Sequence, residues 1–151
     1  MNALEKTKLL AKDLTKEFPR SPRETLAGYV LAARALDKCR SVIAGCASDY
    51  HSGCPLDEMF LDFAGISYEA FKEFVATGAT DAEVATWITT TAKKRPAIEI
   101  IHWNNDLRGK RMSELPDGLQ EYMEEYIPKF IPRNRPIYAF FDVYDIEEQR
   151  I

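Results

Sequence analysis

Residues 21–46 read SPRETLAGYVLAARALDKCRSVIAGC, and this stretch decides the expected fold. Ser21 is a suitable N-cap, and Glu24 completes an S-x-x-E capping box. Pro22 suits the first helical position, where a missing N–H costs nothing. At about 3.6 residues per turn, apolar side chains cover more than half of the circumference, which is typical of a central helix. The pattern predicts one long buried helix over residues 22–44.

The rest of the chain predicts further helices packed around this one. Apolar residues at helical spacing mark the segments 58–65, 68–77, 82–94, 96–107 and 119–127. Pro128, Pro132 and Pro136 predict an extended connector. The tail, residues 137–145, fits a short helix, which we favour, or a strand. We therefore expect an all-α fold of about five or six helices in a single compact domain around the central helix, with a possible short irregular or extended C-terminal segment.

The N-terminus has a different pattern from the rest of the chain. Residues 1–15 alternate charged side chains with leucines. This pattern predicts an N-terminal arm or a short amphipathic helix. Residues 16–151 are then expected to form the single helical domain.

Composition limits the classes of function. The chain has 151 residues, 46 % of them hydrophobic, and a net charge of -4. An acidic balance argues against a nucleic-acid binder and against a polybasic membrane-surface protein. No apolar run reaches membrane-spanning length, and the N-terminal residues are too charged for a secretory signal. Three cysteines without a regular framework suit a reducing compartment, so we expect a cytoplasmic protein.

Three stretches together carry a resemblance to a known family. They are PRSPRETLAGYVLAARALDKCR (19–40), YHSGCPLD (50–57) and ATGATDAEV (76–84). The chain resembles, over roughly residues 13–110, the bacterial family of domains of unknown function numbered 5069. The resemblance implies a small bacterial protein. It implies no reaction and therefore no catalytic residue.

The densest group of reactive side chains lies in the loop of residues 45–57. It contains Tyr50, His51, Cys54 and Asp57. A thiolate is the nucleophilic form of cysteine, and a nearby histidine is one way to produce it. His51 and Cys54 are therefore candidate catalytic residues. In the alternative interpretation, Cys54 packs as a small apolar residue, His51 bonds the backbone and Asp57 caps a helix.

A metal site is a further alternative for this loop. The candidate ligands are His51, Cys54 and either Asp49 or Asp57, with His102 from a later helix. The chain contains only two histidines and has neither a C-x-x-C nor an H-E-x-x-H motif. We therefore predict no metal and no cofactor.

Charged residues also lie on the central helix. Arg34 and Lys38 fall on its narrow polar strip. If that strip is covered, each charge needs a partner, and Glu99 and Asp106 are candidates. Five residues are therefore candidate ligand-binding residues: Arg34, Lys38, Tyr50, Asp57 and His102.

These observations favour a module without catalytic activity that binds a small ligand or a protein partner, because no complete catalytic group is recognisable. The alternative is an enzyme that uses Cys54 with His51 as a thiol or metal site in the 45–57 loop. A third interpretation is a homodimer joined through the aromatic residues of segment 119–144.

Overall fold

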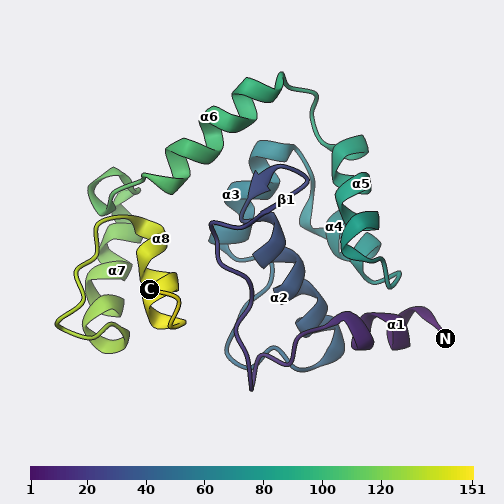
Figure 1. Ribbon diagram of the computed structural model, residues 1–151, viewed down its shortest axis with the longest axis horizontal. Coiled ribbons are helices and arrows are strands. Elements are labelled where there is room, and N and C mark those ends of the chain that lie inside the picture. The colour runs from purple at the N-terminus through teal and green to yellow at the C-terminus, as the bar shows by residue number, and fades with distance from the viewer. The chain divides into compact units, whose positions relative to one another are not determined.

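The computed structural model describes every residue from Met1 to Ile151 and divides the chain into two compact units, Met1–Pro96 and Ala97–Ile151. It contains eight α-helices, one short 3-10 helix and a sheet of two antiparallel strands (Figure 1). The chain is therefore mainly helical, as expected, but the expected number of five or six helices is too low. No helix is both long and apolar enough to cross a membrane.

The N-terminal unit contains α1 (Ala3–Leu10), β1 (Thr25–Leu26), β2 (Tyr29–Val30), α2 (Ala32–Ala44), α3 (Pro55–Ala64), α4 (Tyr68–Val75) and α5 (Asp81–Thr91). The C-terminal unit contains α6 (Ala97–Arg108), the 3-10 helix η1 (Met112–Glu114), α7 (Asp117–Phe130) and α8 (Phe140–Glu147). The predicted division into residues 1–15 and a single domain of residues 16–151 stays a prediction.

The predicted helix over residues 22–44 is wrong in its first part. β1 and β2 form a tight hairpin there, in which Leu26 pairs with Tyr29. The two residues between them, Ala27 and Gly28, have φ of 54° and 87°. Two successive positive φ values are what a two-residue turn of the I′ type requires, and glycine adopts such a value without strain.

The capping-box residues make their contact without starting a helix. The backbone N–H of Ser21 donates to the Glu24 carboxylate at 3.1 Å, and the Glu24 N–H donates to the Ser21 carbonyl at 3.0 Å. These bonds close a single turn. The chain then enters the hairpin, and the N–H of Leu31 returns to the carbonyl of Pro22 at 2.9 Å.

α2 is the buried central helix of the N-terminal unit, although it starts at Ala32. Every residue from Ala32 to Ser41 is buried. α1, α3, α4 and β1 contact it, and Figure 1 shows α2 crossing the middle of this unit. The helix ends at Ala44, the predicted last residue, and Gly45 follows it with φ of 78°.

Aromatic rings join the hairpin to the later helices of this unit. The ring of Tyr29 lies 5.5 Å from that of Phe60 on α3. Phe60 in turn meets Phe71 on α4 edge to face at 6.2 Å, and Phe71 lies 6.4 Å from Trp87 on α5. Aromatic burial of this kind contributes strongly to core stability. The hairpin is thus held by contacts distant in the sequence.

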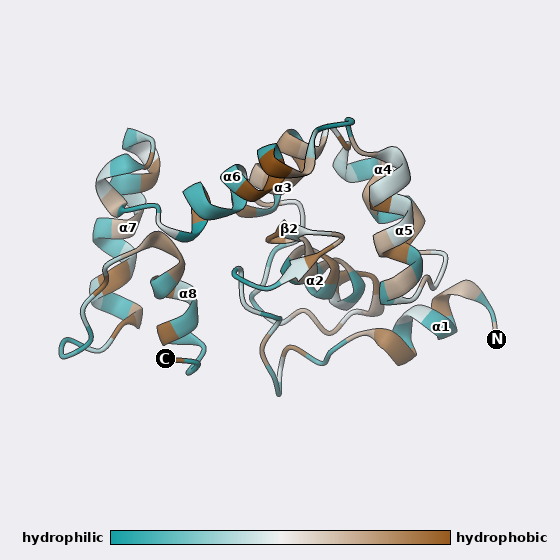
Figure 2. Cartoon of the chain, turned by 45° about the horizontal axis from the view of Figure 1, so that its top comes forward, coloured by the Kyte–Doolittle hydropathy of each residue, from teal (hydrophilic) through white to brown (hydrophobic).

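α1 packs closely against the rest of the N-terminal unit, with Lys6 next to Gly78. Thr7 of α1 is fully buried. At Gly78, where φ is +83°, an added Cβ would lie 2.5 Å from the Cβ of Lys6. Figure 2 shows that the last turn of α1 is apolar.

The C-terminal unit departs from one expectation and agrees with another. α7 continues through Pro128 to Phe130, so the predicted connector begins later than expected. The tail forms α8, the short helix that we favoured over a strand. Its first residue, Phe140, donates its N–H to the carbonyl of Lys110 at 2.7 Å.

We predict that Gly28→Ala destabilises the protein by about 1 kcal/mol, because an L side chain at positive φ is strained. A Cβ at Gly28 would have no atom within 4 Å, so the change in stability reports backbone strain alone and not a side-chain clash. Urea unfolding followed by circular dichroism measures it. Gly118→Ala is the matched control, because Gly118 lies within α7, also in open space. It should stabilise by up to about 1 kcal/mol. Equal effects of the two changes would contradict the assigned turn.

Candidate functional site

Lys38 places an ammonium group inside the N-terminal unit. Its side chain is 4 % exposed, and its Nζ lies 2.9 Å from Oδ1 of Asp57, which is 3 % exposed. A charge buried to this degree is tolerated only with a partner. Lys38 therefore pairs with Asp57, and not with Glu99 or Asp106 as the sequence suggested. Asp106 instead pairs with Lys110 within α6 and the turn that follows it.

Asp57 is held from the start of α3. Its Oδ2 accepts the backbone N–H of Gly53 at 2.9 Å, so the side chain closes the turn that precedes the helix. An acidic group in a first helical turn also interacts favourably with the free N–H groups there. The alternative interpretation of Asp57 as a helix-capping residue fits this geometry.

Cys54 is the N-cap residue of α3 and is partly exposed. Lys38 Nζ lies 3.2 Å from its sulfur and donates a hydrogen bond to it. The same ammonium group thus contacts a carboxylate and a thiol. We call Lys38, Cys54 and Asp57 the Lys38 cluster.

The other predicted residues of the loop lie outside the Lys38 cluster. His51 is exposed, and the hydrogen-bond donor to Cys54 is Lys38, not His51. Tyr50 is partly buried, and the guanidinium of Arg34 lies 5.7 Å from its ring centroid, within cation–π range. Arg34 also donates to the carbonyl of Arg20 at 3.2 Å.

His102 lies on α6 in the C-terminal unit, where it is exposed. Across the chain, no group of three or more His, Cys, Asp or Glu side chains is arranged to hold a metal ion.

A neutral polar group lies beside α2 and α4. The hydroxyl of Tyr68 donates to Ser52 Oγ at 2.7 Å. Burial raises the pKa of the Cys39 thiol to about 11, although hydrogen bonds with Ser52 act in the opposite direction. Burial likewise raises the pKa of Tyr68. These side chains are therefore uncharged near neutral pH.

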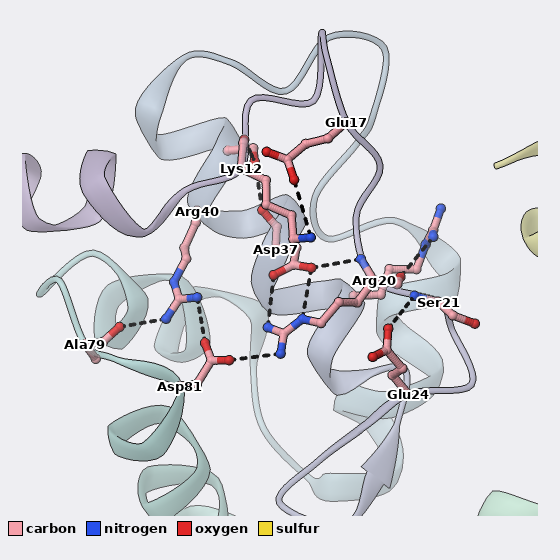
Figure 3. A network of polar contacts seen from close by, with 11 residues as sticks. Lys12, Glu17, Arg20, Ser21, Glu24, Asp37, Arg40, Ala79 and Asp81 are labelled. Carbon is pink, nitrogen blue, oxygen red and sulfur yellow. Dashed lines mark hydrogen bonds and ion pairs between the residues drawn. The ribbon is translucent and has the colours of Figure 1, made fainter. Parts of the chain in front are cut away.

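A second set of charges joins α2 to α5, with Asp37 and Arg40 buried and Arg20 and Asp81 partly exposed (Figure 3). The Arg20 guanidinium donates two hydrogen bonds to the Asp37 carboxylate, one from Nε at 3.0 Å and one from Nη2 at 2.9 Å. Its remaining terminal nitrogen, Nη1, lies 2.9 Å from Asp81. Arg40 contacts the other oxygen of Asp81 at 2.7 Å and donates to the carbonyl of Ala79 at 2.9 Å. No sequence pattern indicated this alternating network of arginines and aspartates.

The electrostatics of Asp81 reflect this network. Burial acts to raise its pKa, but the hydrogen bond from Arg40 and the charges of Arg20 and Arg40 outweigh burial, so the pKa of Asp81 lies below its ordinary value. For Arg20, burial acts to lower the pKa, and the contacts with Asp37 and Asp81 raise it above the ordinary value. Asp81 and Arg20 are therefore charged near neutral pH.

An apolar groove of about 470 Å³ opens to solvent between α4 and α5. Its lining residues are Phe74, Ala82, Glu83, Thr86, Trp87 and Thr90. The rings of Phe74 and Trp87 stack 5.0 Å apart and only 8° from parallel. The helical spacing of both residues is typical of core positions, so no sequence pattern indicated the groove.

An aromatic ridge runs along α7. Tyr122 lies 5.7 Å from Tyr126, which lies 4.4 Å from Phe130. Tyr122 is 57 % and Phe130 is 51 % exposed. Burial raises the pKa of Tyr126, and the hydrogen bond from its hydroxyl to Glu147 acts in the same direction.

Comparison with known proteins places nearly the whole chain in one family. The sequence profile of a family described as a domain of unknown function, DUF5069, matches residues 16–150. A search of curated proteins gives no match to the chain. The matched range includes the Lys38 cluster, the arginine–aspartate network and the groove.

We predict that Asp37→Asn destabilises the protein by about 3 kcal/mol, because it removes one partner of a buried ion pair. Asp37 is 4 % exposed, and Arg20 keeps only Asp81 as an anionic partner in the variant. Urea unfolding measures the loss. The control is Glu17→Gln, in a 3.6 Å pair with Lys12 in which Glu17 is exposed and Lys12 is partly exposed. It should change stability by less than about 0.5 kcal/mol. A small effect at Asp37 would mean that the network contributes little.

Proposed function

The chain belongs to DUF5069, a family of domains of unknown function, so we propose its role from the geometry of the structure. The proposed role is that of a binding module without catalytic activity. It takes an apolar side chain of a partner, or an apolar ligand, into the groove between α4 and α5. The observation that carries the proposal is the stacked pair of Phe74 and Trp87 in the groove. Aromatic side chains, tryptophan above all, are enriched among the residues that dominate binding energy.

The hydroxyl donors on the α5 wall of the groove already have hydrogen-bond partners within the helix. The hydroxyl of Thr86 donates to the carbonyl of Ala82 at 3.0 Å, and that of Thr90 donates to the carbonyl of Thr86 at 2.9 Å. Since these donors are already satisfied, an apolar ligand leaves no hydrogen bond unmade on this wall.

Glu83 sets the charge preference of the groove. It is the single ionisable residue of the lining. Hydrogen bonds from Thr80 lower the pKa of Glu83, so it remains a carboxylate near neutral pH. A negative charge beside an apolar surface disfavours anions. The proposed ligand is therefore apolar and either neutral or cationic.

The alternative function, an enzyme that uses Cys54 with His51, receives less support. A general base must lie within hydrogen-bond reach of the proton that it removes. The contact of the Cys54 sulfur is with Lys38, and His51 faces solvent.

A homodimer remains our proposal for the aromatic ridge of α7. Tyr122 and Phe130 leave large apolar rings in water, and a second copy of the chain would bury them. The ridge lies within the segment 119–144 that the sequence suggested for self-association.

We predict that Thr90→Arg weakens binding of N-phenyl-1-naphthylamine, a neutral apolar dye, by about tenfold or more. A guanidinium in the groove must be desolvated or must block the dye, and a tenfold loss corresponds to about 1.4 kcal/mol. Dye fluorescence measures the affinity. Thr89→Arg is the matched control, because Thr89 is also exposed on α5 and also donates to a helix carbonyl, but does not line the groove. Equal affinities of the two variants would place the dye elsewhere.

We predict that the protein sediments as a dimer at tens of micromolar and that Tyr122→Glu shifts it to a monomer, because a carboxylate in the ridge opposes its burial. Sedimentation velocity distinguishes the two states. Glu125→Gln, an exposed change on the same helix, should leave the dimer intact. A monomeric wild-type protein would remove this proposal and leave the groove proposal unaffected.

A further inference from the structure

The Lys38 cluster combines three groups that binding at the groove does not use. The Cys54 sulfur and the buried Asp57 carboxylate both lie within 3.2 Å of the buried ammonium nitrogen of Lys38, and Cys54 is partly exposed. Loss of one proton to Asp57 makes this nitrogen a nucleophile beside the sulfur.

We propose that Cys54 is a site of oxidation by hydrogen peroxide and that Lys38 captures the oxidised sulfur as a covalent nitrogen–sulfur crosslink. The proposal is independent of the groove and of the role suggested for it. It assigns to the cluster a modification site with a small inorganic peroxide as the co-reactant.

The contacts of the three cysteines favour Cys54 as the oxidised residue. Cys54 lies at the start of α3 and is partly exposed, and its sulfur accepts a hydrogen bond at 3.2 Å from the Lys38 ammonium group, whose nitrogen is the proposed nucleophile. The thiol of Cys46 instead donates to the backbone carbonyl of Lys12 at 3.3 Å, where no amine contacts the sulfur. Cys39 is buried, and its pKa of about 11 keeps it protonated.

The first step oxidises the sulfur by two electrons. The Cys54 thiolate attacks one oxygen of hydrogen peroxide, an S–O bond forms and the O–O bond breaks. The departing hydroxide takes up the proton released by the thiol and leaves as water. The product is a sulfenic acid at Cys54.

The second step involves no further oxidation. Lys38 transfers a proton to Asp57, whose Oδ1 lies 2.9 Å away, and the free amine attacks the sulfur. The N–S bond forms, the S–O bond breaks, and hydroxide leaves as water with the second amine proton. Sulfenic acids condense with nitrogen nucleophiles in this way. The buried ion pair is converted into a neutral amine derivative and a neutral carboxylic acid, so the step leaves no unpaired charge in the interior.

The test treats the full chain with hydrogen peroxide and measures intact mass, free thiols and peptide masses. We expect a mass loss of about 2 Da, the two hydrogens removed in the net reaction, with loss of one of the three thiols. Peptide mapping should show residue 38 joined to residue 54. A thiol reductant should reverse all three changes.

Two variants separate the steps. Lys38→Arg keeps the cation beside Asp57 but removes the amine nucleophile, so the sulfenic acid should persist and label with dimedone several-fold more than in the wild type. Cys54→Ser should lose both the labelling and the mass change, whereas Cys46→Ser should keep them.

Three results would overturn the proposal. One is loss of two thiols, which indicates a disulfide. Another is dimedone labelling that is equal in wild type and Lys38→Arg. The third is oxidation of Cys46 at the same rate as Cys54. The peptide map and the thiol count use the wild-type chain, so these two results do not depend on the folding of any variant.

Discussion

Buried charges on α2 determine how the N-terminal unit is arranged. A helix covered on all sides normally presents apolar side chains, yet Asp37 and Lys38 occupy consecutive buried positions on this one. An unpaired charge in such a place costs several kcal/mol, so each must meet a partner of opposite sign. Arg20 comes from the segment before α2 and Asp57 from α3. Pairing therefore fixes the chain on both sides of the central helix.

The parts of the fold that local signals specify were predictable. Gly45 ends α2, and the capping box of Thr80 and Glu83 starts α5. Residues 22–31 were mistaken for helix because the bonds between Ser21 and Glu24 form in a single turn as well as in a helix. What selects the hairpin is a contact distant in the sequence, that of Tyr29 with Phe60, and periodicity along one segment carries no information about such a contact.

The residues of the candidate sites were only partly predictable, for a related reason. Lys38, Cys54 and Asp57 were all recognised as reactive or charged, but their pairing depends on the path of the loop between α2 and α3. The spacing of His51 and Cys54 suggested that these two residues pair. In the structure the hydrogen bond to the Cys54 sulfur comes from Lys38 instead. Trp87 shares its spacing with core residues, so only three-dimensional packing distinguishes a groove wall from a buried side chain.

The position of Asp81 has a consequence for recognition at the groove. It is the first residue of α5, and it contacts both Arg20 and Arg40. Any tilt of α5 away from α2 separates at least one of these ion pairs. The helix that carries Trp87 is thus held in place, so a ligand in the proposed groove site would cost the protein little conformational entropy. Selectivity at that site would then follow from the shape of a rigid surface.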